Sequence, residues 1–128
     1  MKLYKCNTCG NILEVIQDGA IVPVCCGSFM NQLKINDDEV AVKEKHIPIY
    51  IKDNNEVTIE VGSVLHPSTT EHHIEWITLV TNKNRYTHYL KDDEKPITTF
   101  YLADEDEKVE GIYAYCNLHG LWYKKGRD

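Results

Sequence analysis

The sequence predicts an all-β protein in two parts, a small metal-binding domain over residues 1–36 and a β-sandwich or barrel over residues 37–128. Two observations support this prediction. Four of the five cysteines fall within the first 26 residues, whereas every histidine lies at position 46 or later. After residue 50, short stretches rich in β-branched and aromatic residues alternate with acidic turns, and no sustained helical periodicity occurs.

The boundary between the two parts is placed at a polar, acidic segment, Asn36-Asp37-Asp38-Glu39. A chain of 128 residues is long enough for one domain plus a small appendage. The first part is too short to bury a self-sufficient core, because segments below about 40 residues usually need a metal, disulfides or a partner. An added source of stability is therefore expected within residues 1–36.

The charge of the chain argues against several classes of partner. Lys and Arg number 14 and Asp and Glu 20, so the net charge is −6. Proteins that bind nucleic acid or anionic membrane surfaces rely on clustered Lys and Arg, so neither role is expected. No apolar run approaches the roughly 20 residues of a membrane helix, and no apolar segment precedes Cys6. We therefore expect a cytoplasmic protein.

In the first part, the turn residues lie around the cysteines. Residues 12–16 and 20–24 are predicted to pair as a β-hairpin, with Asp18-Gly19 in its turn because this dipeptide suits positive φ. This hairpin is expected to present one pair of cysteines from each of two loops.

Five strands are predicted in the second part. Residues 56–61 alternate polar and apolar side chains with a period of two, as expected of a half-buried strand. The other four predicted strands are rich in β-branched or aromatic residues and cover residues 74–81, 84–90, 97–102 and 109–116. The acidic runs between the later strands are interpreted as solvated turns.

Four cysteines occur as two close pairs, Cys6 with Cys9 and Cys25 with Cys26. Four thiolates can surround one tetrahedral metal ion, and both zinc and iron accept such a donor set. Adjacent side chains in an extended chain point to opposite faces, so Cys25 and Cys26 need an unusual turn, assisted by Gly27. A distorted tetrahedron is expected. The odd number of cysteines excludes a fully paired disulfide framework.

Histidines and the fifth cysteine form a second group of candidate ligands. His119 follows Cys116 by three residues, a spacing at which both side chains can reach one ion across a turn. Several imidazoles with one thiolate favour a first-row transition metal such as iron, copper or zinc. The other candidates, His46, His66 and the adjacent pair His72 and His73, are expected in short extended segments.

Two of the six histidines are interpreted as structural or exposed. His72 and His73 point to opposite faces if their segment is a strand, so only one of them is expected to face the cluster, and His73 is assigned the other face. His88 has no metal-binding neighbours in the sequence.

In the order and spacing of these motifs, the sequence resembles desulfoferrodoxin, the two-iron form of superoxide reductase, over essentially the whole chain. The N-terminal resemblance lies in Tyr4-Lys5-Cys6-x-x-Cys9-Gly10-Asn11 and Cys25-Cys26-Gly27. The second part carries the blocks Lys43-Glu44-Lys45-His46-Ile47-Pro48, Val61-Gly62-x-x-x-His66-Pro67, His72-x-Ile74-Glu75-Trp76-Ile77 and Tyr115-Cys116-Asn117-Leu118-His119-Gly120-Leu121-Trp122. Glu71 and His73 depart from the family pattern, which often has Lys and commonly Tyr there, but no required donor is lost.

The resemblance implies a desulforedoxin-like N-terminal domain, an immunoglobulin-like β-sandwich and two iron ions per chain. A rubredoxin-like FeS4 centre is implied at Cys6, Cys9, Cys25 and Cys26. The second, non-haem iron is implied to have Cys116 as its axial ligand and four equatorial histidines. These are His46, His66, His72 and His119.

The activity implied by the resemblance is one-electron reduction of superoxide to hydrogen peroxide at a ferrous His4Cys site, which detoxifies superoxide without producing oxygen. Lys45 is expected to steer the anion, because a positive charge beside His46 raises the on-rate of an anion. Glu44 is expected to occupy the sixth position of the oxidised iron. Superoxide as substrate, a small electron donor such as rubredoxin and a homodimer are also implied.

Four other functions stay open from the residues alone, one of them an iron-linked redox sensor, although no separate output domain is evident. The main alternative is an iron electron-transfer protein whose second site is closed, because a sequence does not show an open coordination position. A zinc-ribbon interaction module would use residues 6–26 as a scaffold but leaves the histidine cluster unexplained. A copper–zinc or manganese dismutase fits less well, because one thiolate and no carboxylate ligand suit a one-way reductase better.

Overall fold

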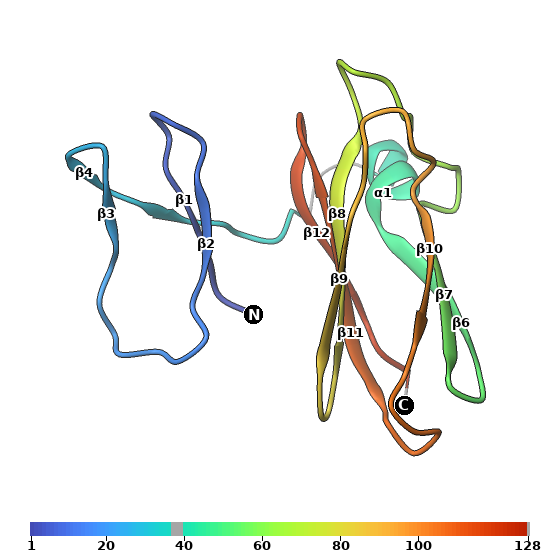
Figure 1. The fold of residues 1–128 in the computed structure, drawn as a ribbon. Coiled ribbons are helices and arrows are strands. Elements are labelled where there is room, and N and C mark those ends of the chain that lie inside the picture. Colours follow the sequence, from blue (N-terminus) through green and yellow to red (C-terminus); the bar gives the residue numbers. More distant parts are fainter. Residues whose placement is uncertain (37–39, 128) are drawn as a thin grey trace. The chain divides into compact units, whose positions relative to one another are not determined.

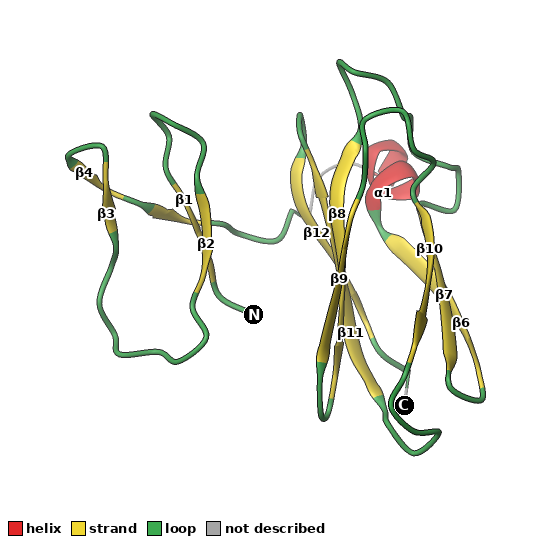
Figure 2. Ribbon diagram, viewed as in Figure 1, coloured by secondary structure: helices red, strands yellow, loops and turns green. Residues whose placement is uncertain are grey.

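The computed structural model describes residues 1–36 and 40–127. These residues are almost entirely strands and connecting loops, with one short helix among them, as Figure 2 shows. The chain divides into two compact units, Met1–Lys34 and Ile35–Asp128. Three residues of the predicted boundary segment, 37–39, lie outside the described residues. No helix among the described residues is long and apolar enough to cross a lipid bilayer.

The smaller unit contains five short strands among its described residues. They are β1 (Leu3–Lys5), β2 (Ile12–Glu14), β3 (Val24–Cys25), β4 (Ser28–Phe29) and β5 (Asn31–Gln32). β1 lies between β2 and β5, while β3 and β4 form a two-stranded ribbon. The buried core of this unit consists of Tyr4, Cys6 and Met30, with Val15 and Cys25 packed against it. This core is small, and two of its five members are candidate metal ligands.

The predicted hairpin between residues 12–16 and 20–24 is wrong. β2 pairs with β1, and residues 15–23 form no strand. The apolar side chains that suggested the hairpin have no core to pack against, since Ile16 is 89% and Ile21 81% exposed. Leu3 and Tyr4, immediately before the first cysteine, are buried and make β1 the central strand.

The larger unit is a sandwich of two antiparallel sheets, which face each other in Figure 1. Its described elements are α1 (Val40–His46), β6 (Pro48–Asp53), β7 (Glu56–Val61), β8 (Ile74–Thr81), β9 (Arg85–Tyr89), β10 (Ile97–Tyr101), β11 (Val109–Cys116) and β12 (Gly120–Lys125). The strand orders are β12-β11-β8-β9 and β10-β7-β6. The five predicted strands correspond to β7 to β11, with β6 and β12 in addition. The expected all-β fold with an immunoglobulin-like sandwich is confirmed.

Alternation along β11 places Cys116 on the core face of the sandwich. Ile112, Ala114 and Cys116 are all fully buried, and Ile77 and Leu79 of β8 belong to the same core cluster. Burial of each large aliphatic side chain stabilises the fold by roughly 1.5–3 kcal/mol. The sulfur therefore stands at the end of a strand whose position is fixed by the core.

His46 ends a helix, so the prediction that it lies in an extended segment is wrong. The amide of Ile47 donates to the Lys43 carbonyl oxygen (2.9 Å) and closes the last turn of α1. The helix ends there because Ile47 precedes Pro48, and the helical conformation is disfavoured for a residue that precedes proline. Seven residues make only two turns, too few for helical periodicity to be visible in the sequence.

Gly62 allows α1 to pack closely against the segment that follows β7. Its φ is +92°, and a Cβ at this position would lie 2.4 Å from the carbonyl oxygen of Glu44. The same carbonyl oxygen also accepts a hydrogen bond from the amide of Val64 (3.1 Å). This contact brings the segment with His66 against the end of the helix that carries His46.

A buried carboxylate, Glu107, ties together loops of the larger unit. It accepts hydrogen bonds from the Tyr86 hydroxyl (2.9 and 3.0 Å), from Nδ2 of Asn84 and the Ala103 amide (each 3.2 Å), and from the Thr81 hydroxyl. Burial alone would raise the pKa of Glu107, but these hydrogen bonds outweigh it and lower the pKa. Because the folded pKa lies below the unfolded one, the carboxylate contributes stability above about pH 4.3 that is lost as the pH falls through the folded pKa.

Glu107→Gln is expected to lower the free energy of unfolding at pH 7 by about 1–3 kcal/mol, because an amide NH2 then faces donors in a buried site. The variant should also lose the part of the acid sensitivity that comes from this carboxylate. Unfolding by urea, followed by tryptophan fluorescence at pH 7 and pH 4, measures both effects. Glu110→Gln changes an exposed carboxylate nearby and should stay within about 0.5 kcal/mol of the native protein. Equal stability of the two variants would contradict the prediction.

Candidate metal centres

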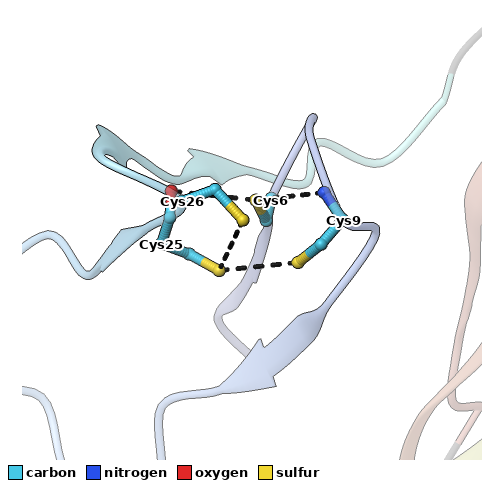
Figure 3. A group of neighbouring side chains, drawn as sticks. All are labelled: Cys6, Cys9, Cys25 and Cys26. Atoms are coloured by element: carbon cyan, nitrogen blue, oxygen red, sulfur yellow. Dashed lines mark hydrogen bonds between the residues drawn. The ribbon is translucent and has the colours of Figure 1, made fainter.

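Four cysteines of the smaller unit converge on one point, as Figure 3 shows. Cys6 and Cys9 flank the turn after β1, and Cys25 and Cys26 lie at the turn between β3 and β4. All four sulfur atoms lie within 4.8 Å of one another, and all four thiols are free. The structure thus brings together the two cysteine pairs of the sequence.

The turn between β3 and β4 explains how two adjacent cysteines face the same point. Cys25 pairs with Ser28, which leaves Cys26 and Gly27 as a two-residue turn. Both turn residues have positive φ, 52° for Cys26 and 76° for Gly27. Positive φ at both central positions is typical of the tight turns of β-hairpins. This turn reverses the usual alternation, as the sequence led us to expect.

The sulfur spacing fits a tetrahedral metal ion. Sγ of Cys25 lies 3.5 Å from Sγ of Cys9 and 3.9 Å from Sγ of Cys26. Thiolates at about 2.3 Å from a tetrahedral ion lie about 3.8 Å from one another. The backbone amide of Cys9 is 3.5 Å from Sγ of Cys6, a hydrogen bond that stabilises negative charge on sulfur.

The cysteine thiols of this cluster differ in pKa. Hydrogen bonding from the backbone of Cys9 foremost lowers the pKa of Cys6 to about 6, whereas hydrogen bonds to the Cys6 and Cys9 side chains raise the pKa of Cys25 to about 12. One thiolate is thus favoured at neutral pH, while the thiols of Cys25 and Cys26 stay protonated. Binding of a metal ion displaces the remaining protons and completes the four-thiolate set.

In the larger unit, four imidazoles converge at one end of the sandwich. They come from the end of α1, the β7–β8 segment and the β11–β12 turn, all at the same end in Figure 1. Going round the ring from His46 to His66, His72, His119 and back, the centroids are 4.6, 4.4, 5.0 and 4.8 Å apart. Neighbouring ring planes cross at 69–83°. We call this arrangement the histidine ring.

Nitrogen atoms of the histidine ring are spaced as ligands of one ion are. Nε2 of His46 lies 3.1 Å from Nε2 of His66 and 3.2 Å from Nδ1 of His119. Imidazole nitrogens bind first-row metals at about 2.1 Å, so two of them at a right angle are roughly 3 Å apart. Nε2 of His72 is buried and has no hydrogen-bond partner, which a metal ion would supply.

Burial favours the neutral form of two of these imidazoles, His66 and His72. Nδ1 of His66 donates to the carbonyl oxygen of Pro67 (2.7 Å), which leaves Nε2 with its lone pair toward the ring. Burial lowers the pKa of His66 to about 4 and also lowers that of His72. Neutral imidazole is the form that binds a metal ion, so these two side chains are ready to act as donors at neutral pH.

Cys116 adds a sulfur donor from the core of the sandwich. Its Sγ lies 3.8 Å from Nδ1 of His119, and the donor atoms of Cys116, His46, His72 and His119 all lie within 4.8 Å of one another. Burial raises the pKa of the Cys116 thiol, while the amides of His119 (3.4 Å) and Leu118 act in the opposite direction. A bound cation would hold this sulfur as a thiolate.

Two residues to which the sequence analysis gave no role support the histidine ring. Trp122 is fully buried and stacks on His46, with ring centroids 4.7 Å apart. The pattern of β12 did not mark this position, because its neighbour Leu121 is buried as well. Asn36 donates through Nδ2 to the carbonyl oxygens of His119 and Leu121, the latter at 3.3 Å. Nothing in the sequence indicated this contact between residues more than 80 positions apart.

Lys45 and Glu44 occupy exposed positions in the last turn of α1. The pKa of His72 is lowered first by burial and also by the charge of Lys45, which is therefore within electrostatic reach of the histidine ring. Glu44 lines a surface depression together with Ser63 and belongs to neither donor group found among the described residues. The catalytic roles of both residues stay predictions.

The remaining two histidines lie outside the histidine ring. Nδ1 of His73 is 2.9 Å from the carbonyl oxygen of Thr69, in the loop that carries His72. Nε2 of His88, on β9, is 2.7 Å from a carboxylate oxygen of Glu94. Each has a protein partner of its own, in keeping with the structural role predicted for it.

Both units of the chain match known proteins. The family model for desulfoferrodoxin matches residues 38–125, and the model for its N-terminal domain matches residues 1–33. A desulfoferrodoxin of Syntrophotalea carbinolica is 44% identical over 126 residues, which cover 98% of this chain and 97% of the relative. A superoxide reductase of Thermococcus kodakarensis is 30% identical over 95 residues, which cover 62% of this chain and 83% of the relative.

A crystal structure gives the same result for the fold. The superoxide reductase from Treponema pallidum superimposes with a TM-score of 0.79 at 31% identity, over 97% of this chain and 96% of that one. The four-cysteine cluster and the histidine–cysteine cluster match the two iron sites of such proteins. Near-complete coverage of curated relatives, together with the two matched family models, shows that the chain belongs to the desulfoferrodoxin family.

Proposed function

We propose that this protein is a superoxide reductase, which transfers one electron to superoxide and, with two protons, forms hydrogen peroxide without producing oxygen. The observation that carries the proposal is the histidine ring with Cys116 beside it. These five protein donors would hold a ferrous ion and would leave it open to a small substrate. The bound ferrous ion supplies the electron for superoxide.

The proposal assigns the donor sets to two irons. Residues 1–36 form the FeS4 domain, whose iron is held by Cys6, Cys9, Cys25 and Cys26. Residues 37–128 form the catalytic domain, whose iron would be held by the sulfur of Cys116 and by four imidazoles. These imidazoles belong to His46, His66, His72 and His119. His66 does not belong to the group of donor atoms that all lie within 4.8 Å of one another. It is included among the iron ligands because its Nε2 lies 3.1 Å from Nε2 of His46.

Lys45 is proposed to attract superoxide to the site. Lys45 is an exposed residue that directly precedes His46, in a chain whose net charge is −6. A local positive potential raises the arrival rate of an anion and does so less at high salt. Glu44, two residues before His46, is proposed as a residue whose carboxylate would bind the oxidised iron and would be released when the iron is reduced.

Lys45→Ala is expected to keep both irons and to slow the second-order reaction with superoxide about tenfold at low ionic strength. The difference from the native protein should shrink as salt is added. Superoxide decay in rapid mixing measures the rate. Lys125→Ala is the control, because it removes the same charge at the end of β12 away from the site. Lys125 pairs with Gly111, whereas Cys116 pairs with Gly120 at the opposite end of that strand. A native rate in Lys45→Ala would remove this residue from the mechanism.

The surroundings of the site support further partners. Leu118 and Leu65, each next to a histidine of the ring, are 60% and 40% exposed. Exposed apolar side chains of this kind suit docking of a small electron donor such as rubredoxin.

The apolar side chains that the smaller unit exposes, Ile16 and Phe29 among them, support a homodimer. Five free cysteines that serve metal ions suit the reducing cytoplasm.

The function is tested by metal content and by product stoichiometry. Purified protein should contain two irons per chain, and each superoxide consumed by the reduced protein should yield one hydrogen peroxide and no oxygen. Oxygen release would indicate a dismutase. Two irons without any reaction with superoxide would favour the electron-transfer protein with a closed second site. Zinc in both sites of natively loaded protein would leave a structural metal protein.

A further inference from the structure

Asn117 joins the two chain segments that carry His72 and Cys116. Its Oδ1 accepts a hydrogen bond from the amide of His73 (2.9 Å), and its Nδ2 donates to the carbonyl oxygen of Glu71 (3.0 Å). The backbone amide of Asn117 donates to the carbonyl oxygen of His73 (3.2 Å). One side chain thus spans His72 by bonding to the backbone on both sides of it.

This contact stands where regular pairing between β8 and β11 ends. A register shift leaves Glu75 as an extra residue in β8 before Cys116 pairs with Ile74. Such a bulge re-aims the strand and interrupts the ladder of hydrogen bonds. The three hydrogen bonds of Asn117 connect the two segments beyond the interruption. They therefore set how far the loop before β8 lies from the turn after β11.

The loop that carries His72 is otherwise held by internal hydrogen bonds. The amide of His72 donates to Oγ1 of Thr69 (3.1 Å), and the amide of Thr69 donates to the carbonyl oxygen of His72 (3.0 Å). These bonds fix the shape of the loop but do not connect it to β11. Nε2 of His72 is buried without a hydrogen-bond partner, so no polar contact of that atom aims the imidazole before an ion binds.

We propose that Asn117 is a positioning residue of the histidine–cysteine iron site, which holds the imidazole of His72 in reach of the ion bound by Cys116 and His119. The inference rests on the second iron site and not on the substrate proposed for it. Groups that orient metal ligands typically change metal affinity or activity 10–100-fold when they are removed.

The test is retention of iron by the iron-loaded, full-length protein in excess chelator, with the two centres followed by their separate absorption. Asn117→Ala is expected to lose iron from the histidine–cysteine site about 10–100 times faster than the native protein, with no change at the four-cysteine site. Asn117→Ser replaces the amide by a hydroxyl, which can make one of the two side-chain hydrogen bonds, so its rate of iron loss should lie between those of Asn117→Ala and the native protein. The absorption that arises from Cys116 and oxidised iron should also shift in Asn117→Ala.

Asn84→Ala is the matched control. It removes an amide that donates to Tyr86 and Glu107, away from the metal sites. This variant should have a lower thermal midpoint but the native rate of iron loss. A native rate in Asn117→Ala, or equal acceleration in Asn84→Ala, would overturn the proposal. If Asn117→Ala does not fold, Asn117→Ser decides by the same criterion. Because the readout needs no superoxide, a protein inactive toward superoxide would refute the proposed function without affecting this result.

Discussion

Cys116→Ser is expected to abolish superoxide reduction, with a fall in the second-order rate of at least about a hundredfold, the scale usual for loss of one essential group. The sulfur is fully buried and lies beside the histidine ring. Serine is close to cysteine in size, so the core keeps its packing. A hydroxyl, however, stays protonated near neutral pH and donates less electron density to a metal ion than a thiolate does.

The measurement combines superoxide decay with visible spectroscopy. On oxidation, Cys116→Ser should lack the sulfur-to-iron absorption of the second centre while it keeps that of the four-cysteine centre. Val109→Ala changes a buried residue at the opposite end of the same strand and should cost stability without loss of activity. Reduction of superoxide by Cys116→Ser at the native rate would show that the reaction does not need this thiolate.

The two metal centres differ in how far their ligands lie apart in the sequence, and this decided how well they could be predicted. The cysteines of the smaller unit lie within 21 consecutive residues, from Cys6 to Cys26, and their two pairs already suggest one tetrahedral ion. The histidine ring joins residues as distant as His46 and His119. Their convergence is a property of the sandwich, so spacing alone predicted only the local pair Cys116 and His119.

Strand prediction succeeded where one face of a strand is buried. The alternation of residues 56–61 follows directly from Val57, Ile59 and Val61, which are fully buried on one face of β7. The same reasoning failed in the smaller unit, because Ile16 and Ile21 are apolar but exposed. An apolar pattern predicts a strand only when a core exists to bury it, and 34 residues provide little core.

Contacts that hold the ligands in place are the part that sequence reasoning could not reach. Asn117 was visible only as a residue between Cys116 and His119, and its hydrogen bonds to the loop of His72 depend on a bulge in β8. Asn36 reaches His119 across most of the chain. Such polar side chains carry no periodicity, since a single residue with the right neighbours in space is sufficient.

Cys26→Ser is expected to remove iron from the four-cysteine centre and to unfold the smaller unit, while superoxide reduction stays within about twofold of the native rate. The core cluster of this unit is small, with Tyr4, Cys6 and Met30 as its buried members. A unit of this size usually depends on its metal, so loss of one ligand removes much of its stability. The larger unit has its own hydrophobic core, whose buried members include Tyr50 and Cys116, and its own candidate metal ligands.

Two readouts distinguish the possible results for Cys26→Ser. Limited proteolysis should cut within residues 1–34 and leave the larger unit intact, and superoxide decay should follow the native rate. Thr8→Ala, an exposed change in the turn between Cys6 and Cys9, should keep the iron and resist proteolysis like the native protein. Activity lost together with the iron, in a variant whose larger unit is still folded, would mean that the four-cysteine centre takes part in the reaction. Native activity would limit that centre to stabilising its unit or to electron supply that the assay does not require.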